Sequence, residues 1–251
     1  MTYLNPSDAV SQQENLTCQI FDELRNKTFD GIGVTRPSYG DGEQVARDIM
    51  AKVATRIGLV VEDDAAGNVY MTLKGKKKDA KPVIIGSHID TVPSCGRFDG
   101  IAGVLAALCL VKYIKVHDIN LPFNLAVYDY LGEELNDWSI SCIGTRGMIG
   151  ALNEDILSRS NSSGNILKDE IDKIGGNSKS LNKPFTMIKN IVACLELHIE
   201  QGKVLDQKKI DIGIVRSIPS ISRFSVVVNG QAGHSGTILI CLLYTSPSPR
   251  D

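Results

Sequence analysis

Residues 82–114, PVIIGSHIDTVPSCGRFDGIAGVLAALCLVKYI, decide the fold class of this chain. The β-branched run at 82–88 is typical of a buried strand in a parallel sheet. A Gly-rich turn separates it from the apolar segment 104–114, which predicts a helix, and residues 124–131 (NLAVYDYL) predict the next strand. Strand, helix and strand in this order form a βαβ unit, so the first two-thirds of the chain is predicted to be α/β.

Further elements are predicted on both sides of this unit. Apolar residues recur at helical spacing in 43–58, and residues 59–75 predict two strands around a Gly-Asn turn. Residues 158–185 predict a polar surface segment with one short helix. A strand-like stretch at 191–202 precedes an alternating pattern that begins near Arg223, and this change predicts a smaller second domain.

Composition describes an ordinary soluble globular protein. The chain has 251 residues, 43% of them hydrophobic, and its 27 Lys and Arg against 29 Asp and Glu give a net charge of −2. This balance gives no reason to expect nucleic acid or a membrane as a partner. The longest apolar run, 101–111, is far shorter than the ~20 residues of a membrane span. Because no secretory signal is recognisable, we expect a cytoplasmic protein with free thiols at its six cysteines.

Two histidines and several carboxylates are candidates for chemistry. His88 and Asp90 lie two apart at a strand end, where a carboxylate can hold an imidazole as a metal ligand. Asp99 follows in a Gly-flanked loop before the apolar helix. Taken singly, the first two also fit a satisfied strand-end pair, and Asp99 also fits a helix N-cap.

A second group of candidates follows the next two strands. Glu133 and Glu134 come after the strand 124–131, at the carboxyl end where open α/β sheets place their sites. In a metal site one of them would bind the ion and its neighbour would accept a proton from the attacking water; the alternative is a solvated loop. His198 is expected inside a strand, with Glu196 and Glu200 on its face. Nitrogen and oxygen ligands without thiolate suit Zn²⁺ or Mn²⁺ at a hydrolytic centre.

Five segments, in this order, resemble the M20-type dinuclear metallohydrolases. They are GVTRPSYGDGEQVARDIM (33–50), GSHIDTVPSCGRFDGIAGVLAAL (86–108), EELNDWSISCIGTRGMIGAL (133–152), ELHIEQGKVLD (196–206) and GIVRSIPSISRFSVVVNGQAGHSGT (213–237). The first and fourth resemble the hydantoinase/carbamoylase branch, which comprises N-carbamoyl-L-amino-acid hydrolases, β-ureidopropionases and allantoate amidohydrolases.

The resemblance implies a site with two divalent metal ions, Zn²⁺ or Mn²⁺. His88 and His198 would hold one ion, Asp99 would bridge the two, and Glu134 would hold the second. The family's second histidine for that ion lies beyond the end of this chain. We therefore expect the 251-residue polypeptide to bind the second metal weakly and to be inactive by itself.

The same resemblance implies roles for four other residues. Glu133 would be the general base and Asp90 the carboxylate that orients His88. Gln201 would contact the substrate, and His234 would reach the partner subunit's site and polarise the scissile carbonyl. A homodimer is implied through the lid domain that carries His234.

The implied fold is α/β: a mixed-sheet catalytic domain with helices on both faces, plus the start of an inserted α+β lid (dimerisation) domain. We expect the catalytic domain at 1–217 and the lid at 218–240. Residues 241–251, CLLYTSPSPRD, resemble the in-frame translation of a sequencing-library adapter, although a natural Ser/Pro-rich tail is the alternative. The chain departs from the family at Cys95, where Gly is usual, and at Asp137-Trp138, where a basic-aromatic pair is common.

The implied function is metal-dependent hydrolysis of a linear, non-peptide amide C–N bond. The expected substrate is a small carbamoyl or ureido compound: an N-carbamoyl-amino acid, ureidopropionate or allantoate. The alternatives are an M20 aminoacylase or dipeptidase, against which His198 argues because peptidase relatives commonly have Asp there, and a non-catalytic remnant.

Overall fold

The computed structural model describes residues 6–77, 79–219, 224 and 226–227. The chain divides into two compact units, Met1–Gln201 and Gly202–Asp251. The first unit contains the sheet and every candidate site residue that the structure describes.

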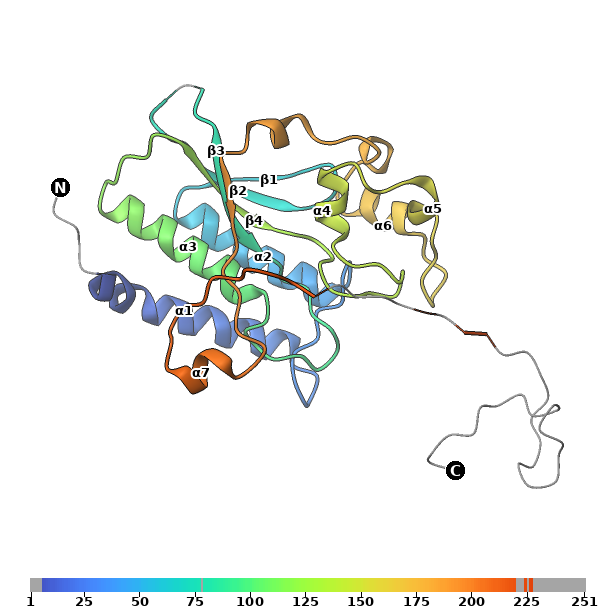
Figure 1. The fold of residues 1–251 in the computed structure, drawn as a ribbon, viewed down its shortest axis with the longest axis horizontal. Helices are drawn as coiled ribbons and strands as arrows, with labels where there is room; N and C mark the ends of the chain where they lie inside the picture. Colours follow the sequence, from blue (N-terminus) through green and yellow to red (C-terminus); the bar gives the residue numbers. More distant parts are fainter. Residues whose placement is uncertain (1–5, 78, 220–223, 225, 228–251) are drawn as a thin grey trace. The chain divides into compact units, whose positions relative to one another are not determined.

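A five-stranded mixed sheet forms the centre of the first unit (Figure 1). Its order is β1-β2-β4-β3-β5, and the strands are β1 Val60–Asp63, β2 Val69–Leu73, β3 Pro82–Ser87, β4 Asn124–Asp129 and β5 Ala193–Leu195. β1 pairs with β2, and β2 with β4, in antiparallel orientation, whereas β3 runs parallel to both β4 and β5. The predicted mixed sheet is therefore confirmed.

Three long helices cover one face of this sheet (Figure 1): α1 Pro6–Thr28, α2 Asp41–Arg56 and α3 Ile101–Val116. α2 buries Ala46, Ile49, Met50 and Val53, which recur at helical spacing. α3 is apolar nearly all round because it lies between the sheet and α1. It connects β3 to β4, which completes the predicted βαβ unit.

Shorter elements follow β4 along the chain. They are α4 Ile143–Met148, α5 Glu154–Leu157, α6 Leu167–Lys173, η1 Ser178–Ser180 and η2 Thr186–Asn190. Met148 of α4 is buried with Ile84 and Tyr128 of the sheet, and residues of η2 pack against this cluster. The short helix expected in the polar segment 158–185 is α6.

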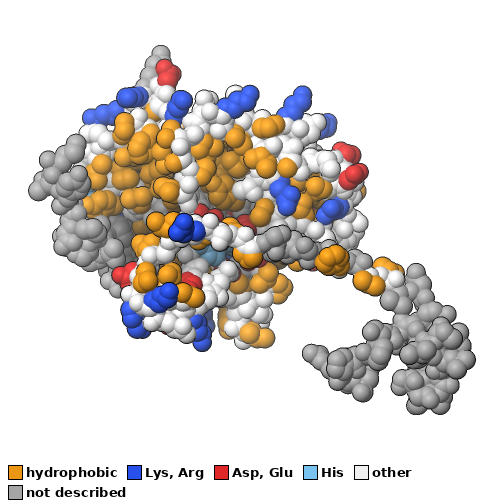
Figure 2. All heavy atoms as spheres, viewed as in Figure 1, with side chains coloured by type: hydrophobic (Ala, Val, Ile, Leu, Met, Phe, Trp, Pro, Cys, Tyr) orange, Lys and Arg blue, Asp and Glu red, His pale blue; other side chains and the backbone are white. Residues whose placement is uncertain are grey.

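β5 is one of the two edge strands of the sheet, and its side chains are exposed. Val192 and Leu195 keep 61% and 55% of their surface exposed. Figure 2 shows hydrophobic side chains gathered over much of the face in view, with lysines and arginines along its upper rim.

The prediction that His198 lies inside a strand is wrong, because β5 ends at Leu195. The last pair between β3 and β5 is Ile85 with Leu195, so β5 stops two residues before β3 ends at Ser87. The chain instead passes close to α3, where Leu197 O lies against Gly103. His198 is therefore carried by an irregular segment that follows the sheet edge.

The second unit contains one described helix, α7 Val204–Lys208. Most of the alternating segment expected from Arg223, His234 and the segment 241–251 lie outside the described residues. The proposed domain boundary between residues 217 and 218 remains a prediction. Among the described residues, no helix has both the length and the apolar character needed to cross a bilayer.

Candidate metal centre

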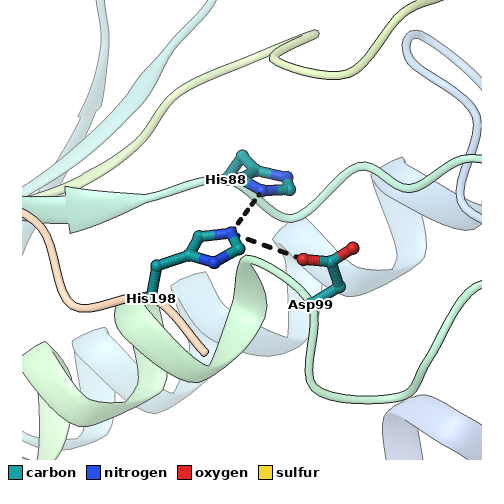
Figure 3. Close-up of side chains that lie close together, drawn as sticks. All are labelled: His88, Asp99 and His198. Atoms are coloured by element: carbon teal, nitrogen blue, oxygen red, sulfur yellow. Dashed lines mark hydrogen bonds and ion pairs between the residues drawn. The ribbon is translucent and has the colours of Figure 1, made fainter. Parts of the chain in front are cut away.

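Three side chains from different parts of the chain meet beyond the carboxyl end of β3 (Figure 3). His88 directly follows β3, Asp99 precedes α3, and His198 follows β5. His88 Nε2 lies 3.3 Å from His198 Nε2, which lies 3.4 Å from Asp99 Oδ1. His88 and Asp99 are buried, whereas the side chain of His198 is 29% exposed.

The outer nitrogen of each imidazole faces a backbone carbonyl. His88 Nδ1 lies 2.9 Å from Asp90 O, and His198 Nδ1 lies 3.0 Å from Ile199 O. A carbonyl only accepts, so Nδ1 is the donor in each contact, and a ring in its neutral form would present a lone pair at Nε2. Two imidazole lone pairs and a carboxylate oxygen thus converge, and they need a proton or a cation between them.

The glutamate pair also lies close to His88. Ligand atoms of His88, Glu133 and Glu134 lie within 4.8 Å of one another. Glu133 Oε2 is 3.8 Å from His88 Nε2, and its side chain is 39% exposed. His88 therefore belongs to both candidate ligand groups, a geometry compatible with two neighbouring ions.

Acidic neighbours change the titration of His88. Burial alone would lower its pKa, but hydrogen bonding to Asp90 and the charges of Asp90 and Glu133 outweigh it and raise the pKa to about 9. Burial also raises the pKa of Glu134, with added repulsion from Asp99 and Glu133. A cation would relieve this excess of negative charge, so the nitrogen and oxygen donors fit a divalent metal such as Zn²⁺ or Mn²⁺.

Asp90 connects the histidine to the glutamate pair. Its carboxylate is completely buried and accepts hydrogen bonds from the backbone N–H groups of Glu133 and Glu134, at 3.1 and 3.0 Å. Asp90 Oδ1 also lies 3.4 Å from His88 Nδ1. The expected contact with His88 is present, and the contacts to the glutamate backbone are additional.

Gln201 and two cysteines complete the surroundings. Gln201 Nε2 lies 3.3 Å from Asp99 Oδ1, so its amide donates to the expected bridging ligand. Cys95 Sγ donates to Asp99 Oδ2 at 3.1 Å, and burial with this contact raises the pKa of the thiol to about 11. Cys142 Sγ lies 3.6 Å from Glu133 Oε1.

Several buried charged residues beneath the site were not predicted from the sequence. Asp129, at the end of β4, lies 3.7 Å from Arg47 Nε, and Arg47 also donates to Gly67 O at 2.7 Å. Burial raises the pKa of Asp129 to about 7 and that of Glu43 well above its usual range. Glu43 and Arg47 lie one turn apart on α2, and this spacing was the available signal, although such pairs normally face solvent.

The sequence of this chain is similar to those of known hydrolases. Residues 84–240 match the family described as Peptidase family M20/M25/M40. The chain is 33% identical to an N-carbamoyl-L-amino acid amidohydrolase of Geobacillus stearothermophilus, with 81% of this chain and 50% of that protein covered. It is 31% identical to a ureidoglycolate hydrolase of Oryza sativa subsp. japonica, with 87% and 46% covered.

A solved structure gives the same indication. The hydantoinase/carbamoylase family amidase of Burkholderia ambifaria is similar to this chain with a TM-score of 0.67 and 31% identity. The similarity covers 77% of this chain and 48% of that one. The chain thus spans about half the length of the curated relatives that it matches.

Proposed function

The chain belongs to peptidase family M20/M25/M40, and we propose that it forms the metal-binding part of an amidohydrolase that cleaves a carbamoyl or ureido C–N bond. The resemblance inferred from the sequence motifs is thereby confirmed at the level of the family. The family is metal-dependent, and the number and identity of the ions belong to the proposal.

The convergence of His88, His198 and Asp99 is the observation that carries this proposal. Two imidazole Nε2 atoms and a carboxylate oxygen meet within hydrogen-bonding distance, and no thiolate is among these three candidate ligands. We assign His88 and His198 to one ion, Asp99 to a bridging position, and Glu134 to a second ion. A divalent cation bound here would supply the positive charge that polarises a carbonyl and acidifies a water molecule.

Glu133 is proposed as the general base. Its carboxylate lies 3.8 Å from His88 Nε2, beside the donors, and more than a third of the side chain is exposed. It is therefore placed to accept a proton from the attacking water and to return it to the leaving amine. Asp90 holds the backbone of Glu133 and the ring of His88, so it positions both groups.

The substrate class follows from what the relatives are called. Two relatives are named for N-carbamoyl-amino acids and for ureidoglycolate. These compounds share a urea-like group next to a carboxylate-bearing carbon. We propose a small carbamoyl or ureido acid as substrate, with Gln201 and His234 in contact with it. A homodimer in which His234 reaches the partner subunit's site, and a cytoplasmic location, are part of the same proposal.

Metal binding is the first experimental test. Zinc and manganese are titrated calorimetrically into the chain and into His88→Ala, Asp99→Asn and His198→Ala. We expect tight binding by the wild type and a loss of at least 100-fold in each variant, since each removes a direct ligand. Equal affinity in all four proteins would contradict the proposed centre.

The substrate class is tested with the product of the complete gene. Ammonia release is measured with N-carbamoyl-amino acids, ureidopropionate, ureidoglycolate and allantoate, and amine release with dipeptides and N-acetyl-amino acids. We expect turnover only in the first group. Turnover of dipeptides or acetyl-amino acids would favour an aminoacylase or dipeptidase, and no turnover with intact metal binding would favour a non-catalytic remnant.

A further inference from the structure

The carboxylate of Asp90 is shared between the glutamate pair and a segment that precedes α2. Asp90 Oδ2 accepts the N–H of Glu134 at 3.0 Å and the hydroxyl of Ser38 at 2.7 Å. Its other oxygen accepts the N–H of Glu133 at 3.1 Å. Ser38 and Asp90 are both buried, so water does not compete for these bonds.

Ser38 has a fixed position relative to Asp90. The residue two before it, Arg36, exchanges hydrogen bonds with Thr91: Arg36 N donates to Thr91 Oγ1 at 2.9 Å, and Thr91 N donates to Arg36 O at 2.8 Å. Arg36 Nε also donates to Ile89 O at 2.6 Å. The residues on both sides of Asp90 are therefore tied to the backbone that carries Ser38.

The neighbouring Tyr39 contacts the same loop as the glutamates. Its ring packs edge-on against Trp138, with centroids 5.5 Å apart. Trp138 in turn donates from Nε1 to Asn165 O. The segment 36–39 thus touches the loop after β4 both through Asp90 and through this aromatic pair.

We propose that Ser38 is a positioning residue for the glutamate pair. Its hydroxyl fixes the rotation of the Asp90 carboxylate, and that carboxylate fixes the backbone from which Glu133 and Glu134 extend. Without the hydroxyl, Asp90 Oδ2 keeps only the Glu134 N–H, and the carboxylate gains freedom to turn about its side-chain bond. This inference rests on the proposed function, because it assigns Ser38 to the same metal centre.

The chain offers a matched control at Ser178. Its Oγ donates to Asp172 Oδ2 at 2.8 Å, and it is 8% exposed, against 7% for Ser38. Ser38→Ala and Ser178→Ala therefore each remove one hydroxyl-to-carboxylate bond of a buried serine, although Asp172 is exposed whereas Asp90 is buried. A merely structural role for Ser38 would make the two variants behave alike.

Two measurements on the 251-residue chain separate positioning from general stability. Amide hydrogen exchange at Glu133 and Glu134 is followed without metal, and zinc affinity is measured by calorimetry. For Ser38→Ala we expect at least fivefold faster exchange at both amides and a three- to tenfold weaker zinc affinity. For Ser178→Ala we expect both quantities to stay within twofold of the wild type.

Unchanged exchange at Glu133 and Glu134 in Ser38→Ala would overturn the inference. So would faster exchange with unchanged zinc affinity, or an equal loss in Ser178→Ala. A wild-type chain that binds no zinc would instead overturn the proposed function, and the exchange rates would then decide by themselves whether Ser38 holds the glutamate loop.

Discussion

His88 and His198 present their Nε2 atoms to each other at 3.3 Å, although 110 positions separate them in the sequence. The two rings are stacked with centroids 5.5 Å apart. Parallel pairing of β3 with β5 brings these residues together, since each follows the end of its strand. β5 is short, but its pairing with β3 places the second imidazole beside the first.

The first prediction separates this pair from the other described histidine. His198→Ala should weaken zinc binding at least 100-fold, because it removes one of two converging lone pairs. His117→Ala is the control, since His117 follows α3 and packs on Tyr113 instead. Calorimetric titration of both variants checks this, and a comparable loss in His117→Ala would contradict the assignment.

The second prediction distinguishes the two adjacent glutamates. In the product of the complete gene, Glu133→Gln should lower kcat by 10²–10⁴-fold with zinc affinity within threefold of the wild type, because it removes a proton acceptor and no ligand. Glu134→Gln should lower zinc content as well. Initial rates and metal analysis of the purified variants provide the measurement.

Glu154→Gln is the matched control for this pair. Glu154 forms an exposed ion pair with Lys168, so its loss should leave both rate and zinc content unchanged. If Glu133→Gln retained wild-type kcat, the general base would have to be another group.

Much of the centre could be predicted from the sequence because strand ends converge in a parallel sheet. His88, Asp99 and the glutamate pair each follow or precede an element that hydrophobic periodicity identifies, and the structure brings them together. The course of the chain at His198 was predicted wrongly, since apolar residues at 191–199 suggested a long strand whereas pairing with β3 ends at Leu195.

The supporting residues were harder to predict for a different reason. Ser38, Glu43 and Arg47 are polar, and polar residues in a helix or just before it normally face water. Their burial depends on the packing of α2 against the sheet, which no local pattern records. The hydrogen bonds that fix the glutamate loop therefore became visible only in three dimensions.

The third prediction concerns the pH dependence of stability without metal. Burial raises the pKa of Asp129 to about 7 from an ordinary value of 3.8, so the folded chain holds this proton more tightly than the unfolded chain. The stabilisation is complete below pH 3.8 and is lost as the pH rises toward 7 and above. Between pH 5 and 7.5, the titration of Asp129 alone should lower the free energy of unfolding by on the order of 2 kcal/mol.

Asp129→Asn should therefore flatten the fall of the unfolding midpoint between pH 5 and 7.5, measured thermally in a chelating buffer. Asp63→Asn is the control, because Asp63 also lies beside Arg47, at 3.4 Å, but its side chain is 50% exposed. That variant should keep the wild-type slope. If the unfolding midpoint of Asp129→Asn fell as steeply as that of the wild type, groups other than Asp129 would control the pH dependence of stability.

The fourth prediction concerns Gly100, at the start of α3. Its φ is +62°, and a Cβ there would collide with the ring of His88. Gly100→Ala should cost about 1–2 kcal/mol for the left-handed backbone and, in addition, displace the imidazole from its place beside His198. Zinc affinity should then fall at least tenfold, measured by calorimetry next to the unfolding midpoint.

Gly164→Ala separates the two effects, because Gly164 has a similar φ of +82° and nothing within 4 Å of its Cβ position. Gly164→Ala should lower the free energy of unfolding by about the same amount for its backbone conformation and keep wild-type zinc affinity. The difference between the two variants then reports only the contact with His88. Equal zinc affinity in both would mean that the His88 ring can move without loss of the ion, and the buried geometry of this ligand would no longer explain binding.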